Sequence, residues 1–252
     1  MNEEMFYSLK GSNRMPASMA TRVASALGRQ IVGQSYPCGG LIEDEAALSV
    51  KYDVSRSVVR DAVKILVGKG LLEVRRGVGT RVLDRRKWGL LDDDVLAWHQ
   101  EADLSEDYLG QLLDVRMMIE PKAARWAAER GSDVEHAKIE AAQLQMEAEQ
   151  TDLHAFVAAD AAFHSAILFA SNNEFLRSME GVMISALMIS IRLTTANLQD
   201  KQQVIPFHRG VTDAILQRNG ALAETKMENH LEDTKARLGH VLGLNPILPK
   251  TH

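Results

Sequence analysis

The chain has 252 residues, of which 46% are hydrophobic and 25% are charged, and its formal net charge is −5. These values lie near the averages for folded proteins and exclude the collagen-like and intrinsically disordered classes. No apolar run reaches the roughly 18 residues that a membrane-spanning helix needs, so we expect no membrane partner. The single cysteine, Cys38, cannot form an intramolecular disulfide, and the acidic N-terminus lacks an apolar signal core. We therefore expect a cytoplasmic protein.

Charge is distributed unevenly along the chain. Residues 1–90 carry 15 Lys and Arg against 9 Asp and Glu, a net of +6, whereas residues 91–252 carry 14 against 25, a net of −11. A basic segment joined to an acidic remainder is typical of a nucleic-acid-binding module attached to a second domain. We accordingly expect a first domain over residues 1–83, with its core at 18–83, a linker at 84–91 and a second domain over 92–246.

Three helices and a hairpin are predicted in the basic third. The first helix follows Ser18, and a second occupies residues 43–53 with acidic residues in its first turn, where the helix dipole favours them. A third helix begins at Ser55 as N-cap, carries a one-sided apolar stripe from Val59, and ends at Gly70. Residues 71–83 predict two short strands around a glycine-containing turn. This order is that of a winged helix-turn-helix, a fold that binds DNA.

The polar face of the third helix carries the candidate DNA contacts. Arginine can bond guanine edges bidentately or clamp a phosphate, and the glycines of the turn let backbone approach a phosphate closely. The alternative is an ordinary solvated helix face, which is common in proteins. The predicted DNA-contact residues are Ser55, Arg56, Ser57, Arg60, Lys64, Arg76 and Gly77.

The acidic two-thirds of the chain is predicted to be helical throughout. Apolar residues recur at helical spacing, strand signals are absent and no solenoid repeat is evident, so a single helical bundle is the expected architecture. Pro121 lies inside an otherwise periodic stretch, where it should kink or divide the helix.

Polar residues occupy apolar stripes at several positions of this bundle. Asp160 and His164 lie four residues apart on one otherwise apolar helix face, and His208 and His230 lie on the apolar stripes of two later helices. A buried carboxylate is costly unless it is paired or bound to a metal. One carboxylate and three imidazoles suit a divalent metal, Zn²⁺ first and Ni²⁺, Mn²⁺ or Fe²⁺ as alternatives. The competing interpretation is that the histidines are simply hydrogen-bonded in the core.

Two arginines also stand at apolar positions. Arg116 lies on the inward stripe of its helix, where it could pair with Glu120 four residues further on. A bidentate arginine beside a metal would instead suit a carboxylate ligand. Arg192, on another apolar helix, is a second candidate for binding such a ligand.

The run LSVKYDVSRSVVRDAVKILVGKGLLEVRRGVGTRV resembles the DNA-binding domain of the GntR family of bacterial transcription regulators over about 65 residues. The resemblance implies DNA contacts by the residues at Arg56, Ser57, Arg60 and Gly77. Some relatives carry an arginine where this sequence has Ala46, which implies a different base preference.

The acidic portion is similar to the FCD effector domain of FadR-type GntR regulators, an all-α bundle of six or seven helices. In many of these domains a metal is held by an Asp-x-x-x-His pair and two later histidines, a pattern that Asp160, His164, His208 and His230 match. The resemblance also implies that Arg116 lines the effector cavity. The segments WGLLDDDVLAW and IEPKAARWAAERG resemble more narrowly the galactonate and related sugar-acid repressors of this subfamily.

The sequence therefore predicts a mostly α-helical, homodimeric transcription regulator rather than an enzyme. We expect a repressor of a sugar-acid or carboxylate catabolic operon that binds double-stranded operator DNA and leaves it when a small carboxylate binds near the metal. Two alternatives remain open at this stage. One is a regulator that senses the metal itself, and the other is a metal-dependent hydrolase.

Overall fold

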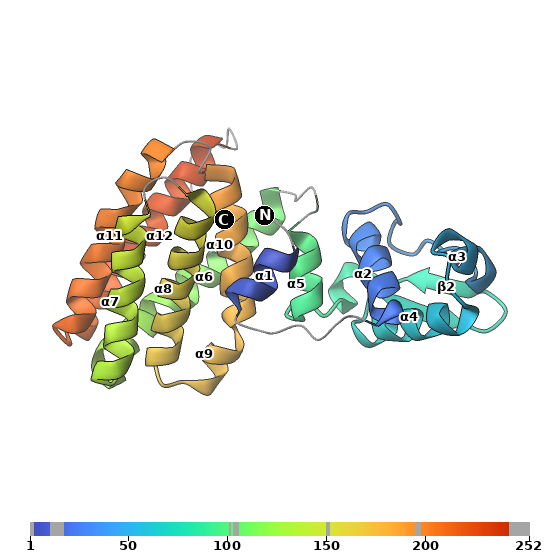
Figure 1. Cartoon of the computed structure of the whole chain (residues 1–252), viewed down its shortest axis with the longest axis horizontal. Coiled ribbons are helices and arrows are strands. Elements are labelled where there is room, and N and C mark those ends of the chain that lie inside the picture. Colours follow the sequence, from blue (N-terminus) through green and yellow to red (C-terminus); the bar gives the residue numbers. More distant parts are fainter. Residues whose placement is uncertain are drawn as a thin grey trace, which may run out of the picture. The chain divides into compact units, whose positions relative to one another are not determined.

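The computed structural model describes residues 3–10, 18–100, 102, 106–149, 152–194 and 198–241 of the chain. Its contacts divide the chain into two units, Met1–Leu104 and Ser105–His252. Both units are mostly helical, and a single small hairpin lies in the N-terminal one (Figure 1). The predicted fold class, a winged helix-turn-helix followed by a helical bundle, is therefore confirmed.

The N-terminal unit contains the three predicted helices and the hairpin. The strands pair antiparallel, with Leu72 opposite Val82 and Arg75 opposite Gly79. A short N-terminal helix and a 3-10 turn were not predicted from the sequence. In chain order the elements are α1 (Glu3–Leu9), α2 (Met19–Val32), α3 (Glu45–Lys51), α4 (Arg56–Gly68), β1 (Leu72–Arg75), β2 (Gly79–Val82), η1 (Arg85–Lys87) and α5 (Asp93–His99).

Local sequence signals fix the ends of α4. The side chain of Ser55 accepts a hydrogen bond from the backbone N–H of Val58, as expected of an N-cap. After the helix, Gly70 adopts a positive φ of 74°, and a Cβ at this position would lie 2.1 Å from the carbonyl oxygen of Lys87. Glycine is therefore required there both for its backbone conformation and for the close approach of the following segment.

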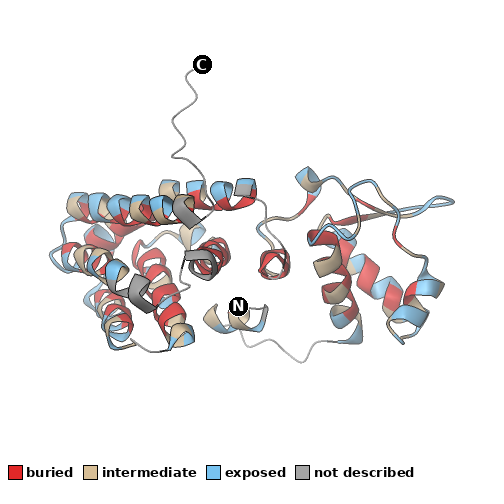
Figure 2. Ribbon diagram, turned by 90° about the horizontal axis from the view of Figure 1, so that it is seen from above, coloured by how far each residue is buried: buried red, intermediate tan, exposed pale blue. Residues whose placement is uncertain are grey.

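The apolar stripes of α2, α3 and α4 meet in one core, which also includes residues of both strands. Figure 2 shows that the buried faces of these helices turn toward one another. Leu27, Leu48, Val59 and Leu66 are all almost completely buried in this cluster. The core fixes α4 so that its polar face, which carries the predicted DNA contacts, stays exposed to solvent.

Helix α5 packs within the N-terminal unit. The indole N–H of Trp98 donates to the hydroxyl of Ser25 on α2 at 3.0 Å. Its ring lies against Gly28, where an added Cβ would come within 2.4 Å of the indole. At the start of α5, Lys69 makes ion pairs with Asp92 and Asp94, each at 2.7 Å. The division between the two units thus falls after α5, whereas the sequence suggested a linker before it.

The C-terminal unit is a bundle in which α6 packs against α8, α10, α11 and α12. Helix α6 continues through Pro121 as one element, so of the two expected outcomes, a kink or a division of the helix, the division is wrong. Packing on several sides outweighs the loss of one backbone hydrogen bond. After α8 the chain forms two consecutive helices, which are separated at Met179. The elements are α6 (Glu106–Arg130), α7 (Asp133–Ala148), α8 (Leu153–Ala170), α9 (Glu174–Ser178), α10 (Glu180–Thr194), α11 (Leu198–Leu216) and α12 (Gly220–Val241).

Helix α8 is long and apolar enough to cross a membrane by length and composition alone, with 18 residues and a mean hydropathy of 1.5. The expectation that no apolar run reaches this length was therefore wrong. Within the bundle, 56% of α8 is buried, and its inward face carries Asp160 and His164. These features identify α8 as the core helix of a folded domain.

His99, at the end of α5, is held in one tautomer. Its Nδ1–H donates to the carbonyl oxygen of Val95 at 2.7 Å, and its Nε2 lies 3.1 Å from the Nη2 of Arg85. Because a guanidinium can only donate, Nε2 must accept, and the ring is neutral. Burial lowers the pKa of His99 to about 4, with the charge of Arg85 acting in the same direction and the hydrogen bond to Val95 opposing it.

This depressed pKa predicts that acid weakens the N-terminal unit. The unfolded chain takes up a proton on His99 near pH 6.5, whereas the folded chain does so only near pH 4. The free energy of unfolding is therefore unaffected by His99 above pH 6.5 and decreases as the pH falls from 6.5 toward 4. The shift corresponds to about 3 kcal/mol at most. Urea unfolding followed by tryptophan fluorescence should lose more stability between pH 7.5 and 5 in the wild type than in His99→Gln. Parallel pH profiles for the two proteins would contradict this assignment.

Candidate metal centre and DNA-contact surface

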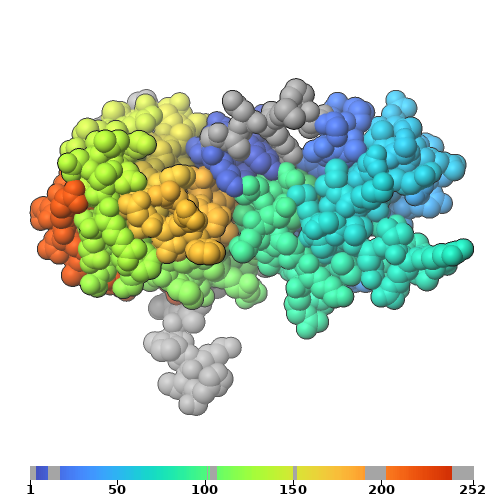
Figure 3. Space-filling model, turned by 90° about the horizontal axis from the view of Figure 1, so that it is seen from below, coloured from blue at the N-terminus to red at the C-terminus, as the bar shows by residue number. Residues whose placement is uncertain are grey.

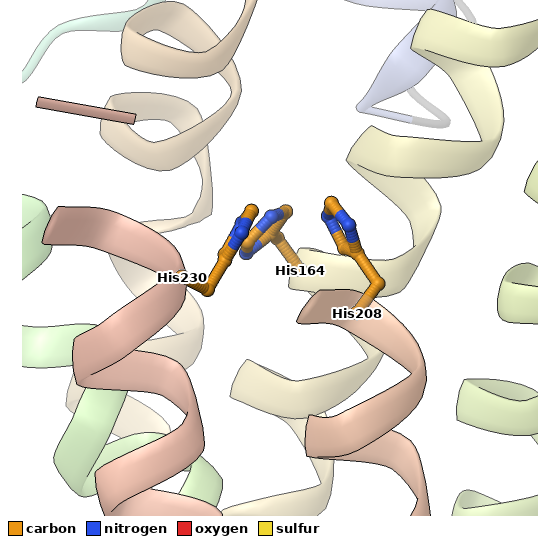
Figure 4. A group of neighbouring side chains, drawn as sticks. All are labelled: His164, His208 and His230. Atoms are coloured by element: carbon orange, nitrogen blue, oxygen red, sulfur yellow. The ribbon is translucent and has the colours of Figure 1, made fainter. Parts of the chain in front are cut away.

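Three helices of the C-terminal unit bring the four predicted metal ligands together. Asp160 and His164 lie one turn apart on α8, His208 lies on α11 and His230 on α12, and each is at most 5% exposed. Figure 4 shows the three imidazole rings turned toward one another between the helices. One nitrogen of each ring lies within 4.8 Å of those of the other two.

Asp160 connects two of these rings. Its Oδ1 lies 2.9 Å from Nε2 of His208 and 3.3 Å from Nε2 of His164. The other nitrogen of His208, Nδ1, lies 3.0 Å from the carbonyl oxygen of Val204, which can only accept. In the neutral tautomer that donates to Val204, the lone pair of Nε2 faces a carboxylate oxygen, so a proton or a metal cation is needed between them.

His230 provides the clearest orphaned atom of the cluster. Its Nδ1 is buried and has no hydrogen-bond partner within the part of the chain that the structure describes. Burial, together with the nearby His208, His164 and Arg116, keeps the pKa of His230 well below its ordinary value of 6.5. The ring is thus neutral and offers a lone pair, as a metal ligand must.

An Arg–Glu pair on α6 completes the cluster. Nε of Arg116 donates to Oε1 of Glu120 at 2.5 Å, and Nη2 of Arg116 lies 3.4 Å from Nε2 of His164. Oε2 of Glu120 lies 2.5 Å from Nδ1 of His164. Both α6 side chains are almost completely buried. Glu120 thus bridges the guanidinium and one of the predicted ligands.

These contacts determine the charges of the metal-free cluster. Burial opposes ionisation of Glu120, but Arg116 and His164 outweigh it and lower the pKa of Glu120 to about 2. Burial likewise opposes protonation of His164, yet Glu120 and Asp160 raise its pKa to about 9. Asp160 is also desolvated, and its pKa stays well below 3.8 because His208 and His164 favour the carboxylate. The carboxylates of Glu120 and Asp160 therefore lie on either side of a protonated His164, and Glu120 also faces the guanidinium of Arg116.

The donor set fits a divalent metal ion. Imidazole nitrogens and a carboxylate oxygen are the ligands that Zn²⁺ and its neighbours in the first transition row accept. His164, His208, His230 and Asp160 would hold the ion, and the carboxylate of Glu120 would lie beside His164, with its Oε2 2.5 Å from Nδ1 of that ring. Such an ion would supply a positive charge at a site from which water is largely excluded. The donors are compatible with several metals.

The predicted DNA contacts form an exposed surface on α4 and the hairpin. Arg56, Ser57, Arg60 and Lys64 are all exposed. Nε of Arg60 donates to Oε2 of Glu45, at the start of α3, at 2.9 Å. Because both side chains are about half exposed, this ion pair is weak and Arg60 can exchange Glu45 for another partner.

The wing lies between β1 and β2. Arg76 and Gly77 are at its exposed tip, and Gly77 has a φ of +78°. This hairpin forms a narrow projection on the N-terminal unit (Figure 3). Ser55, also a predicted DNA contact, caps α4 and shares a 2.8 Å hydrogen bond with the hydroxyl of Ser57.

The protein is similar to regulators of bacterial operons over nearly its whole length. Residues 19–82 match the bacterial regulatory proteins of the gntR family, and residues 111–233 match the FCD domain. It is 32% identical to the galactonate operon transcriptional repressor of Escherichia coli over 90% of this chain and 100% of that protein. The chain belongs to the GntR family. It is a transcription regulator with an FCD domain, and not an enzyme.

Two further relatives of this GntR protein are a transcriptional activator and a regulator of known structure. The Glc operon transcriptional activator of Escherichia coli is 28% identical over 86% of this chain and 87% of the activator. The solved structure of Lar, which controls expression of the agr system of Listeria monocytogenes, has a TM-score of 0.63 and 16% identity, over 90% of this chain and 99% of Lar. This likeness to Lar supports the fold alone.

Sequence reasoning about the GntR effector domain left two matters incomplete. It identified Glu120 only as a partner for Arg116 and missed its approach to His164. The signal was present, since Glu120 shares the inward stripe of Arg116 one turn further on. The side chain of Arg192, the second predicted effector contact, lies outside the described residues.

Breaking the buried Arg116–Glu120 ion pair on α6 should lower the free energy of unfolding far more than breaking an exposed ion pair of the same spacing. Arg116→Ala leaves Glu120 buried without its guanidinium and should lower the free energy of unfolding by about 3–5 kcal/mol. Arg125 and Glu129 form an exposed pair four residues apart on the same helix, so Arg125→Ala should cost about 0–1 kcal/mol. Chemical denaturation of the metal-free variants measures both values. Equal losses would show that burial does not govern this pair.

Proposed function

We propose that this protein is a ligand-responsive repressor of a sugar-acid or carboxylate catabolic operon. A small carboxylate would bind beside a divalent metal in the C-terminal domain and release the protein from its operator. The observation that carries this proposal is the buried cluster of Arg116, Asp160 and three histidines in a domain joined to a DNA-binding module. Burying such charges costs desolvation free energy, and a ligand-binding role explains why the core contains them.

The direction of the response is proposed from similarity. The relative that is 32% identical is named a repressor, and the one that is 28% identical is named an activator. The repressor is matched along its whole length, which favours repression. The galactonate in its name also supports a sugar acid as the effector class.

The switch requires two DNA-binding units. Helix-turn-helix modules gain affinity by binding two half-sites, so we infer a homodimer on a palindromic operator. The carboxylate must favour one arrangement of the two DNA-binding units over the other, and a coupling of about 1–3 kcal/mol is sufficient. Such a regulator works where the chromosome is, so we place it in the cytoplasm.

A metal-sensing regulator is the second candidate. The three imidazoles could hold an ion without any organic ligand, and the ion itself would then be the signal. Zn²⁺ is the metal we expect in either case, with Ni²⁺, Mn²⁺ and Fe²⁺ as alternatives. The two candidates differ in whether operator affinity follows the metal concentration in the absence of an acid.

Arg60 is the residue that tests the DNA surface. If Arg60 contacts a base, Arg60→Ala should weaken operator binding by about 1–3 kcal/mol, and if it contacts a phosphate, the slope of affinity against salt should fall. The measurement is a binding titration on an operator that the wild-type protein selects from random-sequence DNA. Arg86→Ala is the control, because Arg86 is an arginine of the same unit that is 90% exposed and belongs to η1 rather than to α4 or the hairpin. Unchanged affinity and salt slope would refute the role of Arg60.

His164 is the residue that tests the metal site. His164→Ala should reduce bound metal from about one ion per chain to a small fraction of that and abolish the response to carboxylates, because it removes one ligand of four. Operator binding should remain. His154→Ala is the matched control, since His154 is exposed nearly three turns earlier on the same helix. Elemental analysis after dialysis gives the metal content, and full retention of metal by His164→Ala would exclude this site.

A further inference from the structure

Glu120 is not among the expected metal ligands, yet it is at the centre of the buried cluster. Its Oε1 accepts from Nε of Arg116 and its Oε2 faces Nδ1 of His164, each at 2.5 Å. A second Arg116 nitrogen, Nη2, lies 3.5 Å from Oε2. The Nε/Nη2 edge, one of the two edges by which the guanidinium could bind a carboxylate ligand bidentately, is therefore already occupied by a carboxylate of the protein.

The charges of the loaded site can be counted. Arg116, Glu120 and Asp160 are the only buried Arg, Lys, Asp or Glu side chains in the described part of the chain. Metal-bound imidazoles are neutral. One guanidinium, two carboxylates and a divalent ion leave a single net positive charge.

This net charge limits what can bind. Inside a protein an uncompensated charge is expensive, and charges interact strongly because the effective dielectric constant is low. One monoanion neutralises the site, whereas a dianion replaces the excess positive charge with an excess negative one. Without Glu120 the count would be two positive charges, and a dianion would be the neutralising ligand.

We infer that Glu120 sets the charge of the effector, so that the site takes a monocarboxylate and rejects dicarboxylates of the same size. This inference rests on the proposed function, in which a carboxylate binds beside the metal. Glu120 acts without touching the ligand, because it cancels the charge of Arg116 and leaves the ion as the sole source of excess positive charge. It is a specificity-determining residue rather than a ligand contact.

Galactonate and galactarate test the inference, because they share a six-carbon skeleton and differ by one carboxylate. Calorimetric titration of the Zn²⁺-loaded full-length protein should give at least about tenfold tighter binding of galactonate. In Glu120→Gln the amide oxygen can still accept from His164 or Arg116, but the negative charge is gone. The affinity ratio should shift by about tenfold or more toward galactarate.

Two further variants separate charge from shape. Glu129→Gln removes the carboxylate of the exposed pair on the same helix and should leave the ratio as in the wild type. The double variant Arg116→Met/Glu120→Gln removes one charge of each sign, so it should restore the preference for galactonate. If Glu120→Gln does not fold, Arg116→Met provides the test, because its loaded site has no net charge and should bind both acids weakly.

The outcomes distinguish this inference from the proposed function. Equal binding of the two acids by the wild type, or an unchanged ratio in Glu120→Gln with its metal still bound, would overturn the charge assignment and leave a carboxylate-responsive regulator intact. A double variant that prefers galactarate would also overturn it. Binding of neither acid by the metal-loaded wild type would instead refute the proposed effector class.

Discussion

The C-terminal unit depends on one constraint, which is that charges in a protein core must be compensated where they lie. Arg116, Glu120, His164, Asp160 and His208 form an unbroken chain of contacts, in which the carboxylate of Glu120 contacts the positively charged Arg116 and His164 and that of Asp160 contacts His164 and His208. These residues lie on α6, α8 and α11. The three helices must therefore pack in positions that bring each buried charge next to its partner. Two imidazoles of this chain of contacts, those of His164 and His208, also face the ring of His230, so that three imidazoles are turned toward one another (Figure 4).

Much of this arrangement could be predicted from the sequence because its signals are local. The four-residue spacing of Asp160 and His164, and of Arg116 and Glu120, places each pair on one helix face regardless of the rest of the fold. The N-cap at Ser55 and the positive φ at Gly70 are likewise set by a few neighbouring residues. These features need only helical geometry and the stereochemistry of glycine.

The parts that the sequence did not provide depend on distant neighbours. The approach of Glu120 to His164 joins positions 44 residues apart on two helices, and neither periodicity nor spacing encodes it. Pro121 was expected to kink or divide α6, yet α6 is not divided, because the helices packed around it hold it continuous. The division of the chain after α5 follows from the docking of Trp98 on α2, a contact between residues 73 positions apart.

The docking of Trp98 has a practical consequence for dissecting the protein. A fragment that ended where the basic segment gives way to the acidic one, near residue 90, would retain the DNA-contact residues but would lack the indole that covers Gly28 and Ser25. It would expose apolar surface on α2 and deprive Lys69 of both its carboxylate partners. The shortest part of the chain with a complete N-terminal core therefore extends through α5. The domain boundary suggested by the change in charge lies before α5, so a domain cut at that boundary would be too short to fold completely.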